Sequence, residues 1–473
     1  MHGLNLIFFT LYQLVVILMI VHVIMDNRQP AKTMAWALVI WFVPVVGIVF
    51  YLFFGVNTRK ERLISQRSLD QLSKRSMLEF VEQKNLQLPE AHKAVIDLFV
   101  NENFSLPFKD NDIKIYNDGY TFFPALLREI AEAKAHIHID IYIIEDDALG
   151  NLVADALIAK VRQGVEVKLI YDDVGCWSVK HSFFERMREE GIEVSPFLPV
   201  RFPSFTSKVN YRNHRKLIVI DGRTAFVGGM NIALRYVKGT KTQPWRDTML
   251  QVTGSGVYSL QRAFLVDWYF VDRTQVSGRK YYPPIETAPN NCILQTVTSG
   301  PSNAYPEIMQ GYVRIILNAE RYIFIETPYF LPTEPVLFAL KTAALGGVDV
   351  RILVPYRSDA RFVEWASRSY LREVIDAGVK VSLYTAGFMH SKVLVSDDQI
   401  CSCGSTNVDF RSFENNFEAN VFIYDEGVAS QMRDVFLTDE QHSLLFKDIP
   451  KRANPRFLKR LGESVVRMLS PLM

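Results

Sequence analysis

The sequence predicts an α/β protein with two duplicated halves, each a mixed sheet flanked by helices, after an N-terminal hairpin of two transmembrane helices. Three observations point to this fold class: two long apolar runs at the start, alternating strand-like and helical stretches, and a histidine–lysine motif that occurs twice. At 473 residues the chain has room for several domains. We expect the hairpin at 1–56, a linker or helical segment at 57–108, and the two halves at 109–285 and 286–473.

The two apolar runs are Leu4–Met25 and Met34–Phe54, separated by a polar loop that contains Pro30. Each is long enough for a membrane-spanning helix, which needs about 20 apolar residues. A cleaved signal peptide fits badly, because no Lys or Arg precedes the first run and no small-residue cleavage site follows it.

Basic residues are concentrated after the second run. The polar loop has only Arg28 and Lys32, whereas six basic residues follow the second run: Arg59, Lys60, Arg62, Arg67, Lys74 and Arg75. The positive-inside rule then predicts a multi-pass protein of the plasma membrane, with its N-terminus and its large C-terminal part in the cytoplasm.

Composition argues against several classes of protein. The formal net charge of +2 gives no sign of a nucleic-acid partner. Four cysteines in so long a chain do not suggest a disulfide framework. Cys401 and Cys403 lie close to His390 in sequence, but the set lacks a fourth zinc ligand and the usual CxxC spacing. We therefore expect no metal and no cofactor.

Three strand-like segments recur in the same order, at offsets of 186, 183 and 187 residues. The matched pairs are Ala135–Ile144 with Arg321–Phe330, Gly164–Ile170 with Gly347–Leu353, and Gly191–Val194 with Gly378–Val381. A single match would mean little, but three in order indicate a duplication.

A fourth match carries the chemistry. Asn213–Asn231 and Met389–Asn407 share the pattern H-x-K-x4-D-x6-G-[GS]-x-N. Its residues are His214, Lys216, Asp221 and Asn231 in the first copy, and His390, Lys392, Asp397, Ser405 and Asn407 in the second. A lone His-x-Lys is more often an ordinary pair of strand residues, but two copies with identical spacing favour a catalytic site.

The spacing predicts a β-hairpin in each copy. His214 and Lys216 are two positions apart and so point to one face of a strand. Asp221 lies seven positions from His214, about 23 Å along a straight strand. We therefore expect the motif aspartates, Asp221 and Asp397, to shape the turn rather than to transfer protons.

A two-residue turn would set the pairing across each hairpin. A turn at Asp221-Gly222 places His214 opposite Gly229, and a turn at Asp397-Asp398 places His390 opposite Ser405. Each hairpin would then present a histidine, a lysine, a small residue and an asparagine.

Two such sets meeting at a pseudo-two-fold axis would form one phosphodiester pocket without a metal. The lysines and asparagines would neutralise and hydrogen-bond the non-bridging oxygens. One histidine would attack phosphorus and become covalently modified. The other would protonate the leaving alkoxide and then deprotonate the incoming alcohol.

The doubled motif resembles the phospholipase D superfamily, and with the apolar hairpin nearly the whole chain resembles its bacterial cardiolipin synthases. The resemblance implies two phospholipase D-like halves that transfer a phosphatidyl group from one phosphatidylglycerol to another and release glycerol. It also implies a carboxylate after each motif that orients the histidine. Glu418, 28 residues after His390, fits this role, and Asp247, 33 residues after His214, fits it less well. Gly229 stands where the second copy has Ser405, so one hydroxyl contact is missing.

We expect His214 to be the nucleophile and His390 the acid and base. In the family the N-terminal histidine is often the nucleophile. The better spacing of Glu418 also suggests that it holds His390, which would favour the proton that an acid needs.

Other functions use some of the same features. A phospholipase D-type hydrolase would share every catalytic residue and differ only in using water as the acceptor. A nuclease is disfavoured by the hairpin and the near-neutral charge, and a scaffold with a dead site by the intact motifs. The partners we expect are phosphatidylglycerol and the membrane, without nucleic acid; the sequence is compatible with an oligomer and leaves the acceptor lipid open.

The C-terminus carries an apolar stripe at helical spacing. The stripe comprises Phe457, Leu458, Leu461, Val465, Met468 and Leu469, and the basic residues Arg456, Lys459, Arg460 and Arg467 accompany it. Either a basic amphipathic helix on the membrane surface or a helix packed on the protein core would have this pattern.

Overall fold

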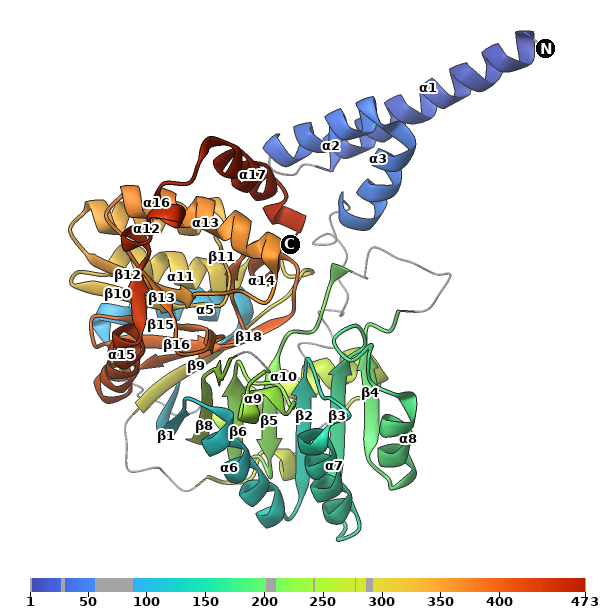
Figure 1. The fold of residues 1–473 in the computed structure, drawn as a ribbon. Coiled ribbons are helices and arrows are strands. Elements are labelled where there is room, and N and C mark those ends of the chain that lie inside the picture. The colour runs from blue at the N-terminus through green and yellow to red at the C-terminus, as the bar shows by residue number, and fades with distance from the viewer. Residues whose placement is uncertain are drawn as a thin grey trace. The chain divides into compact units, whose positions relative to one another are not determined.

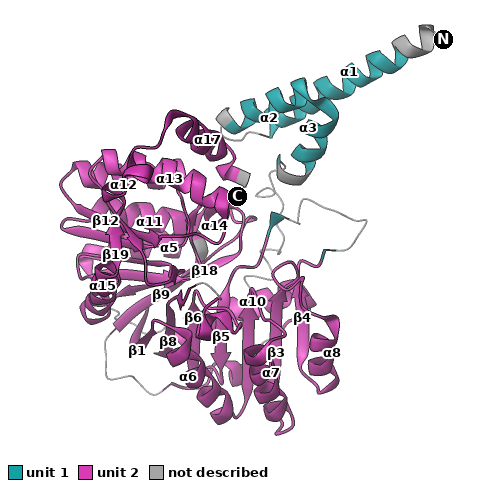
Figure 2. Ribbon diagram, viewed as in Figure 1, with its two compact units in different colours: residues 1–62, 200–211 teal, residues 63–199, 212–473 magenta. Residues whose placement is uncertain are grey.

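The computed structural model describes residues 2–26, 30–55, 88–200, 210–240, 243–276, 278–285 and 292–472. The chain divides into two compact units, one of residues 1–62 and 200–211 and one of residues 63–199 and 212–473 (Figure 2). Most of the predicted linker lies outside the described residues. So do Arg28 and the six basic residues after the second run, on which the predicted orientation depends.

The N-terminal unit contains one helix that could cross a membrane. Helix α1 spans His2–Met25, and its segment Ile7–Met25 has a mean hydropathy of 2.5 and is largely exposed. By length and composition this is the one such helix among the described residues.

The prediction that the second apolar run forms one continuous helix is wrong. It is divided into α2 (Pro30–Phe42), α3 (Pro44–Phe50) and a π-helical turn, η1 (Tyr51–Gly55). The break falls at Val43, whose φ of −134° and ψ of 65° are not helical. The cause is Pro44, because a proline ring disfavours the helical conformation in the residue before it.

The second unit is built on one mixed sheet of fifteen strands among the described residues (Figure 1). From the centre outwards the first half has the order β1-β8-β6-β5-β2-β3-β4, and the second half has the order β9-β18-β16-β15-β10-β12-β13-β19. Strands β1 and β9 pair antiparallel and join the halves. In both halves three strands are parallel and the others antiparallel, so the predicted duplication and mixed sheet are confirmed.

The strands of the first half are β1 (Phe108–Tyr116), β2 (His136–Ile141), β3 (Glu166–Asp172), β4 (Glu193–Phe197), β5 (Lys216–Ile220), β6 (Thr224–Gly228) and β8 (Met249–Gly254). Those of the second are β9 (Cys292–Ser299), β10 (Tyr322–Glu326), β12 (Asp349–Pro355), β13 (Lys380–Tyr384), β15 (Val393–Ser396), β16 (Ile400–Gly404), β18 (Glu418–Tyr424) and β19 (Ser443–Leu445). In the described part of the chain, four two-residue strands lie outside this sheet: β7 (Trp245–Arg246), β11 (Phe330–Leu331), β14 (Phe388–Met389) and β17 (Val408–Asp409).

Helices cover both faces of the sheet, which is why its strands are apolar on both sides. The helices of the first half are α6 (Gly119–Glu132), α7 (Ala148–Val161), α8 (His181–Glu189), α9 (Arg235–Lys238) and α10 (Val257–Asp272). Those packed in the second are α5 (Lys93–Asn103), α11 (Glu307–Asn318), α12 (Glu334–Leu345), α13 (Arg361–Asp376), α14 (Phe410–Glu414), α15 (Glu426–Gln441), α16 (Pro450–Ala453) and α17 (Phe457–Arg467).

Alternation along β2 shows how the two faces are used. Ile137 and Ile139 pack in a core with α6, α7 and α8. The intervening His138 stacks on Phe264 of α10, on the opposite face.

The turn between β5 and β6 has three residues rather than the predicted two. Leu217 pairs with Val227 and Ile220 with Thr224, which leaves Asp221, Gly222 and Arg223 in the turn. The second copy has the same register, with Val393 opposite Cys403 and Ser396 opposite Ile400. Asp221 and Gly222 have φ of 54° and 63°, and Asp397 and Asp398 have φ of 56° and 60°.

The predicted pairing across the hairpins is therefore wrong by one residue. Extending the observed register places His214 opposite Met230 and His390 opposite Thr406. The extra turn residue arises because Asp221 is committed to the neighbouring strand, where its amide donates to the His136 carbonyl at 2.9 Å.

Candidate active site

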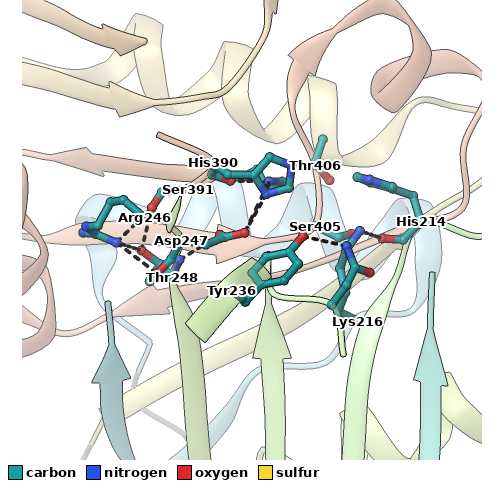
Figure 3. A network of polar contacts seen from close by, with 12 residues as sticks. His214, Lys216, Tyr236, Arg246, Asp247, Thr248, His390, Ser391, Ser405 and Thr406 are labelled. Carbon is teal, nitrogen blue, oxygen red and sulfur yellow. Dashed lines mark hydrogen bonds and ion pairs between the residues drawn. The ribbon is translucent and has the colours of Figure 1, made fainter. Parts of the chain in front are cut away.

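The site lies where the two motif hairpins start. His214 precedes β5 and His390 precedes β15, and Figure 3 shows both imidazoles in one cluster of polar side chains. The His214 side chain is 12% exposed and that of His390 is 9% exposed, so both are almost enclosed but reachable. Lys216 and Lys392 are fully buried beside them.

Each histidine is held by the carboxylate of the other half. Nδ1 of His214 lies 3.0 and 3.1 Å from the two carboxylate oxygens of Glu418. Nδ1 of His390 lies 2.6 Å from Oδ2 of Asp247. The prediction that Glu418 holds His390, and Asp247 His214, is therefore wrong, although both carboxylates do orient a histidine.

Backbone pairing between the halves explains this exchange. Strand β14 runs parallel to β7, with Met389 opposite Arg246, so the next residues are His390 and Asp247. A parallel bridge joins Asn213 to Phe417, and here the next residues are His214 and Glu418. The His214 amide donates to the Phe417 carbonyl at 2.9 Å, which fixes the register.

Asp247 and Glu418 occupy equivalent places in the two halves. Gly228 pairs with Met249 across β6 and β8, and Gly404 pairs with Asn420 across β16 and β18. Each carboxylate lies two residues before the second member of its pair. Asp247 lies further along the chain from its motif histidine than Glu418 does, because the connection before Asp247 contains helix α9. The longer spacing therefore does not count against Asp247.

The glycine of the first motif is required by Asp247. A Cβ atom on Gly229 would lie 2.0 Å from Oδ1 of Asp247, far inside van der Waals contact. In the second half the longer Glu418 leaves room for Ser405, whose hydroxyl donates to Oε2 of Glu418 at 2.5 Å. The missing hydroxyl on the first side thus follows from the shorter carboxylate.

The environment keeps both imidazoles neutral in the free protein. Burial away from water lowers the pKa of His214 to about 4, although the Glu418 carboxylate opposes this shift. Burial lowers the pKa of His390 to about 3, and the adjacent Lys392 ammonium adds to the effect. Since each Nδ1 faces a carboxylate, which can only accept, we assign the ring proton to Nδ1 and the lone pair to Nε2. Nζ of Lys392 also lies 2.8 Å from Nδ1 of His390, and with this assignment it donates to the His390 carbonyl instead.

The two lysines link the halves electrostatically. Nζ of Lys216 donates to the His214 carbonyl at 2.5 Å, and Lys392 donates to the His390 carbonyl. The Lys392 charge lowers the pKa of His214, and the Lys216 charge lowers that of His390, so the two motifs act on each other. Burial lowers the pKa of Lys216 to about 7 and also lowers that of Lys392.

The motif aspartates lie at the turns. The Asp221 carboxylate accepts from the amides of Lys134, Ala135 and His136 at 2.7 to 2.9 Å. The Asp397 carboxylate accepts from the amides of Glu320, Arg321 and Tyr322 at 2.7 to 2.9 Å. Asp221 thus holds its hairpin to the start of β2, and Asp397 holds the other hairpin to the start of β10. This agrees with the prediction that the two aspartates shape the turns.

The two asparagines have different surroundings. Asn231 accepts from the Ile143 amide at 3.0 Å and donates to the Tyr236 hydroxyl at 2.8 Å. Asn407 hydrogen-bonds Asp409, and its buried Oδ1 has no partner among the described residues. Asn407 is therefore the one of the pair with an acceptor left for a ligand.

Three residues of the site were not predicted from the sequence. The Tyr142 ring lies edge-on to His214 with centroids 4.9 Å apart, and Tyr236 lies edge-on to His390 at 6.1 Å. Thr406 is drawn between the two histidines in Figure 3, and its buried hydroxyl has no partner among the described residues. Only Thr406 lies within the motif, at an unspecified position, so the sequence contained no signal for these residues.

The cysteines near His390 are core residues of β16. Cys401 and Cys403 are buried free thiols, and burial raises the pKa of both. Among the described residues no group of three or more His, Cys, Asp or Glu side chains is placed to hold a metal ion.

Family models match most of the chain. A model described as "Cardiolipin synthase, PLD-like domain" matches residues 126–250 and 312–440, one match in each half. A model described as "Phospholipase_D-nuclease N-terminal" matches residues 14–55, the apolar N-terminal region.

Known proteins resemble the chain over its whole length. A cardiolipin synthase of Oceanobacillus iheyensis is 38% identical over 462 residues, covering 95% of each chain. The major cardiolipin synthase of Bacillus subtilis is 37% identical over 471 residues, covering 97% of each. The solved structure of phosphatidylserine synthase from Haemophilus influenzae has a TM-score of 0.62 at 17% identity and covers 80% of this chain and 100% of that one. At that identity the superposition speaks for the fold alone, whereas the sequence matches show that the chain belongs to the cardiolipin synthases, the phosphatidyltransferases of the phospholipase D superfamily.

Proposed function

We propose that the protein transfers a phosphatidyl group from one phosphatidylglycerol molecule to the hydroxyl of a second, with release of glycerol, through a phosphohistidine intermediate. The observation that carries this proposal is the pair of imidazoles, each held at Nδ1 by a carboxylate of the other half. This leaves two Nε2 atoms for one phosphorus.

In the first step Nε2 of one histidine attacks phosphorus, and the bond from phosphorus to the oxygen of the headgroup glycerol breaks. The other histidine takes up a proton at Nε2 when the bound phosphodiester anion raises its pKa, and it gives this proton to the leaving alkoxide, so that glycerol departs neutral. In the second step this histidine, now neutral, removes the hydroxyl proton of the second phosphatidylglycerol. The resulting oxygen nucleophile attacks phosphorus, the nitrogen–phosphorus bond breaks, and cardiolipin forms.

The surrounding groups favour the crowded, more negative phosphorus of the transition state. Lys216 and Lys392 supply positive charge from buried positions, where it is less screened than in water. Glu418 and Asp247 stabilise the imidazolium that forms on the histidine each of them holds.

We assign the nucleophile to His214 and the acid and base to His390. Because Glu418 contacts His214, the sequence spacing gives no reason for this order. The resemblance to the family supports it.

The proposed setting is the plasma membrane. Helix α1 would anchor the protein in the bilayer, where both lipid substrates lie. We call the unit of residues 63–199 and 212–473 the catalytic unit. The basic residues after the second apolar run favour a multi-pass arrangement with this unit in the cytoplasm.

Purified protein in vesicles with phosphatidylglycerol labelled in its headgroup tests the reaction. Cardiolipin and one free glycerol per product are expected. Phosphatidic acid in place of cardiolipin would show the hydrolase instead, and no lipid product would contradict both functions.

A donor with a nitrophenolate leaving group tests the covalent step, because this group departs without an acid. His390→Ala should then accumulate a phosphatidyl adduct on the peptide that carries His214, detected by mass spectrometry after digestion. An adduct found instead on His390 in a His214→Ala variant would reverse the assignment, and no adduct in either variant would refute the two-step mechanism.

A further inference from the structure

The C-terminal helix α17 has its polar side inward and its apolar side outward. Helices on soluble proteins normally bury the apolar stripe. Here the six apolar residues of the stripe are between 47% and 79% exposed: Phe457, Leu458, Leu461, Val465, Met468 and Leu469. The alternative that this stripe packs on the protein core is therefore wrong.

Ion pairs hold the inner face of α17 against α13. Glu463 is 1% exposed and lies 2.6 Å from the Arg372 guanidinium and 3.6 Å from that of Arg368. Arg467 pairs with Glu373 at 2.6 Å, and its guanidinium stacks over the Tyr370 ring at 3.9 Å. Because a buried charge cannot be left without its partner at low cost, this face cannot rotate outward to hide the stripe.

Helix α13 extends the exposed apolar surface. Phe362 is 67% exposed and Trp365 is 43% exposed. Gly462 of α17 lies over Trp365, with 4.0 Å between the ring and the place of a Cβ atom, so the two helices form one surface. We call these two residues and the six of the stripe the α13–α17 surface. Monomeric soluble proteins rarely expose a contiguous patch of such side chains unless it binds something.

The charges beside the patch indicate what it binds. Arg456, directly before α17, and Lys459 and Arg460 on α17 are exposed, whereas the acidic Glu463 of the same helix faces inward. Protein–protein interfaces are depleted in lysine, whereas helices that lie in a membrane interface combine an apolar face with flanking Lys and Arg. Anionic headgroups complement this arrangement.

We propose that the α13–α17 surface docks the catalytic unit on an anionic lipid bilayer, with the apolar side chains in the interface and the basic side chains among the headgroups. This contact is additional to the α1 anchor, and it does not depend on the proposed acceptor lipid or on the covalent intermediate.

A fluorescent label on the full-length protein tests the proposal. The four native cysteines are buried, and burial raises the pKa of the Cys176 thiol to about 12, so a new surface cysteine can be labelled selectively. Leu458→Cys would carry an environment-sensitive dye on α17. Leu152→Cys on α7, where Leu152 is 51% exposed, is the matched control. Figure 1 shows α7 and α17 in different halves of the catalytic unit.

Both labelled proteins would be reconstituted in phosphatidylglycerol-containing vesicles, with or without brominated acyl chains. We expect the dye at position 458 to shift to the blue and to be quenched by bromine, and the dye at 152 to do neither. Lys459→Gln with Arg460→Gln should lower the ratio of quenched to unquenched dye about 30-fold, from roughly a fivefold factor for each lost charge. Turnover of a soluble short-chain donor by this double variant serves as the control for folding.

Three outcomes would overturn the proposal. Equal quenching at both positions would show that α17 has no preference for lipid. A blue shift without bromine quenching that grows with the protein-to-lipid ratio would show a second copy of the chain on this surface. A change that appears only when a cell extract is added would show a protein partner.

Discussion

Glu418, from the second half of the chain, lies 3.0 Å from Nδ1 of His214 in the first half. Asp247 holds His390 in the reverse sense at 2.6 Å. Neither half therefore orients its own motif histidine, and both must be folded together for either imidazole to be held in place.

We call the contact of each carboxylate with the histidine of the other half the cross-pairing. It predicts which variant slows which step. In a His390→Ala background, adding Glu418→Gln should slow formation of the adduct on His214 by about 10²-fold or more, since the imidazole loses its orienting partner. Adding Asp247→Asn to the same background should change this rate little, because the histidine it holds is already gone. Rapid-quench kinetics with the nitrophenyl donor measure both rates, and the opposite ranking would contradict the cross-pairing.

The two histidines should behave as one unit. His214→Ala and His390→Ala should each lower kcat by about 10⁴-fold or more with phosphatidylglycerol, and the double variant should lose little further activity. Steady-state cardiolipin formation in vesicles measures the three rates. Losses that multiply in the double variant would indicate two independent sites.

Gly229 and Ser405 should differ sharply in what they tolerate. Gly229→Ala forces Asp247 away from His390, because the new Cβ would lie 2.0 Å from its Oδ1, and we expect about a 10²-fold loss of kcat/KM. Ser405→Ala removes one hydroxyl bond to Glu418 and should cost about tenfold or less. Thermal unfolding of both variants separates these losses from misfolding, and full activity of Gly229→Ala would show that Asp247 is not confined as described.

The turn aspartates should affect stability rather than chemistry. Asp221→Ala removes a carboxylate that accepts from three amides and should cost about 2–4 kcal/mol of unfolding free energy. Asp221→Asn should cost less, because asparagine keeps one acceptor and tolerates the left-handed φ of 54°. Denaturant unfolding gives the free energies, and the folded fraction should keep its kcat; a large loss of kcat in stable Asp221→Asn would assign the carboxylate a chemical role.

Anion binding should draw protons into the site. Burial lowers the pKa of Lys216 to about 7, so at pH 8 this amine is mostly neutral in the free protein. A bound phosphodiester anion raises the pKa of Lys216 and of the imidazoles, so roughly one proton should be taken up per site at pH 8. At pH 6 Lys216 is already charged, and uptake should fall to the contribution of the histidines, whose free pKa values are about 4 and 3.

Calorimetry with a non-hydrolysable phosphonate analogue measures this uptake from the dependence of the binding enthalpy on the buffer. Lys216→Arg is the control, because its guanidinium stays charged and should abolish the difference between pH 8 and pH 6. Binding without proton uptake at pH 8 would show that the lysine is charged before the anion arrives.

Much of the fold was readable from the sequence because it depends on local and repeated patterns. The alternation of strands and helices, the order of the matched segments and the doubled motif required only the periodicities of side chains along the chain. The place of Asp221 also followed, because seven residues of extended chain cannot return to the starting point.

The sequence was misleading wherever one backbone group or one close contact decided the outcome. It did not reveal that Asp221 would bond to the start of β2, which adds a residue to the turn and shifts the hairpin register. It also treated Met34–Phe54 as one apolar helix, although Pro44 divides it at Val43.

The amino-acid pattern by itself determined that this protein has two copies of a histidine–lysine motif and an apolar N-terminal helix. Only the tertiary structure decided that Glu418 serves His214 and Asp247 serves His390, because that choice is made by parallel backbone pairing between segments more than 140 residues apart. It also decided that the apolar stripe of α17 faces outward, since ion pairs of Glu463 and Arg467 with α13 hold the polar side against the protein. Sequence spacing describes which residues share a strand or a helix, whereas contacts between distant segments depend on how the whole chain packs.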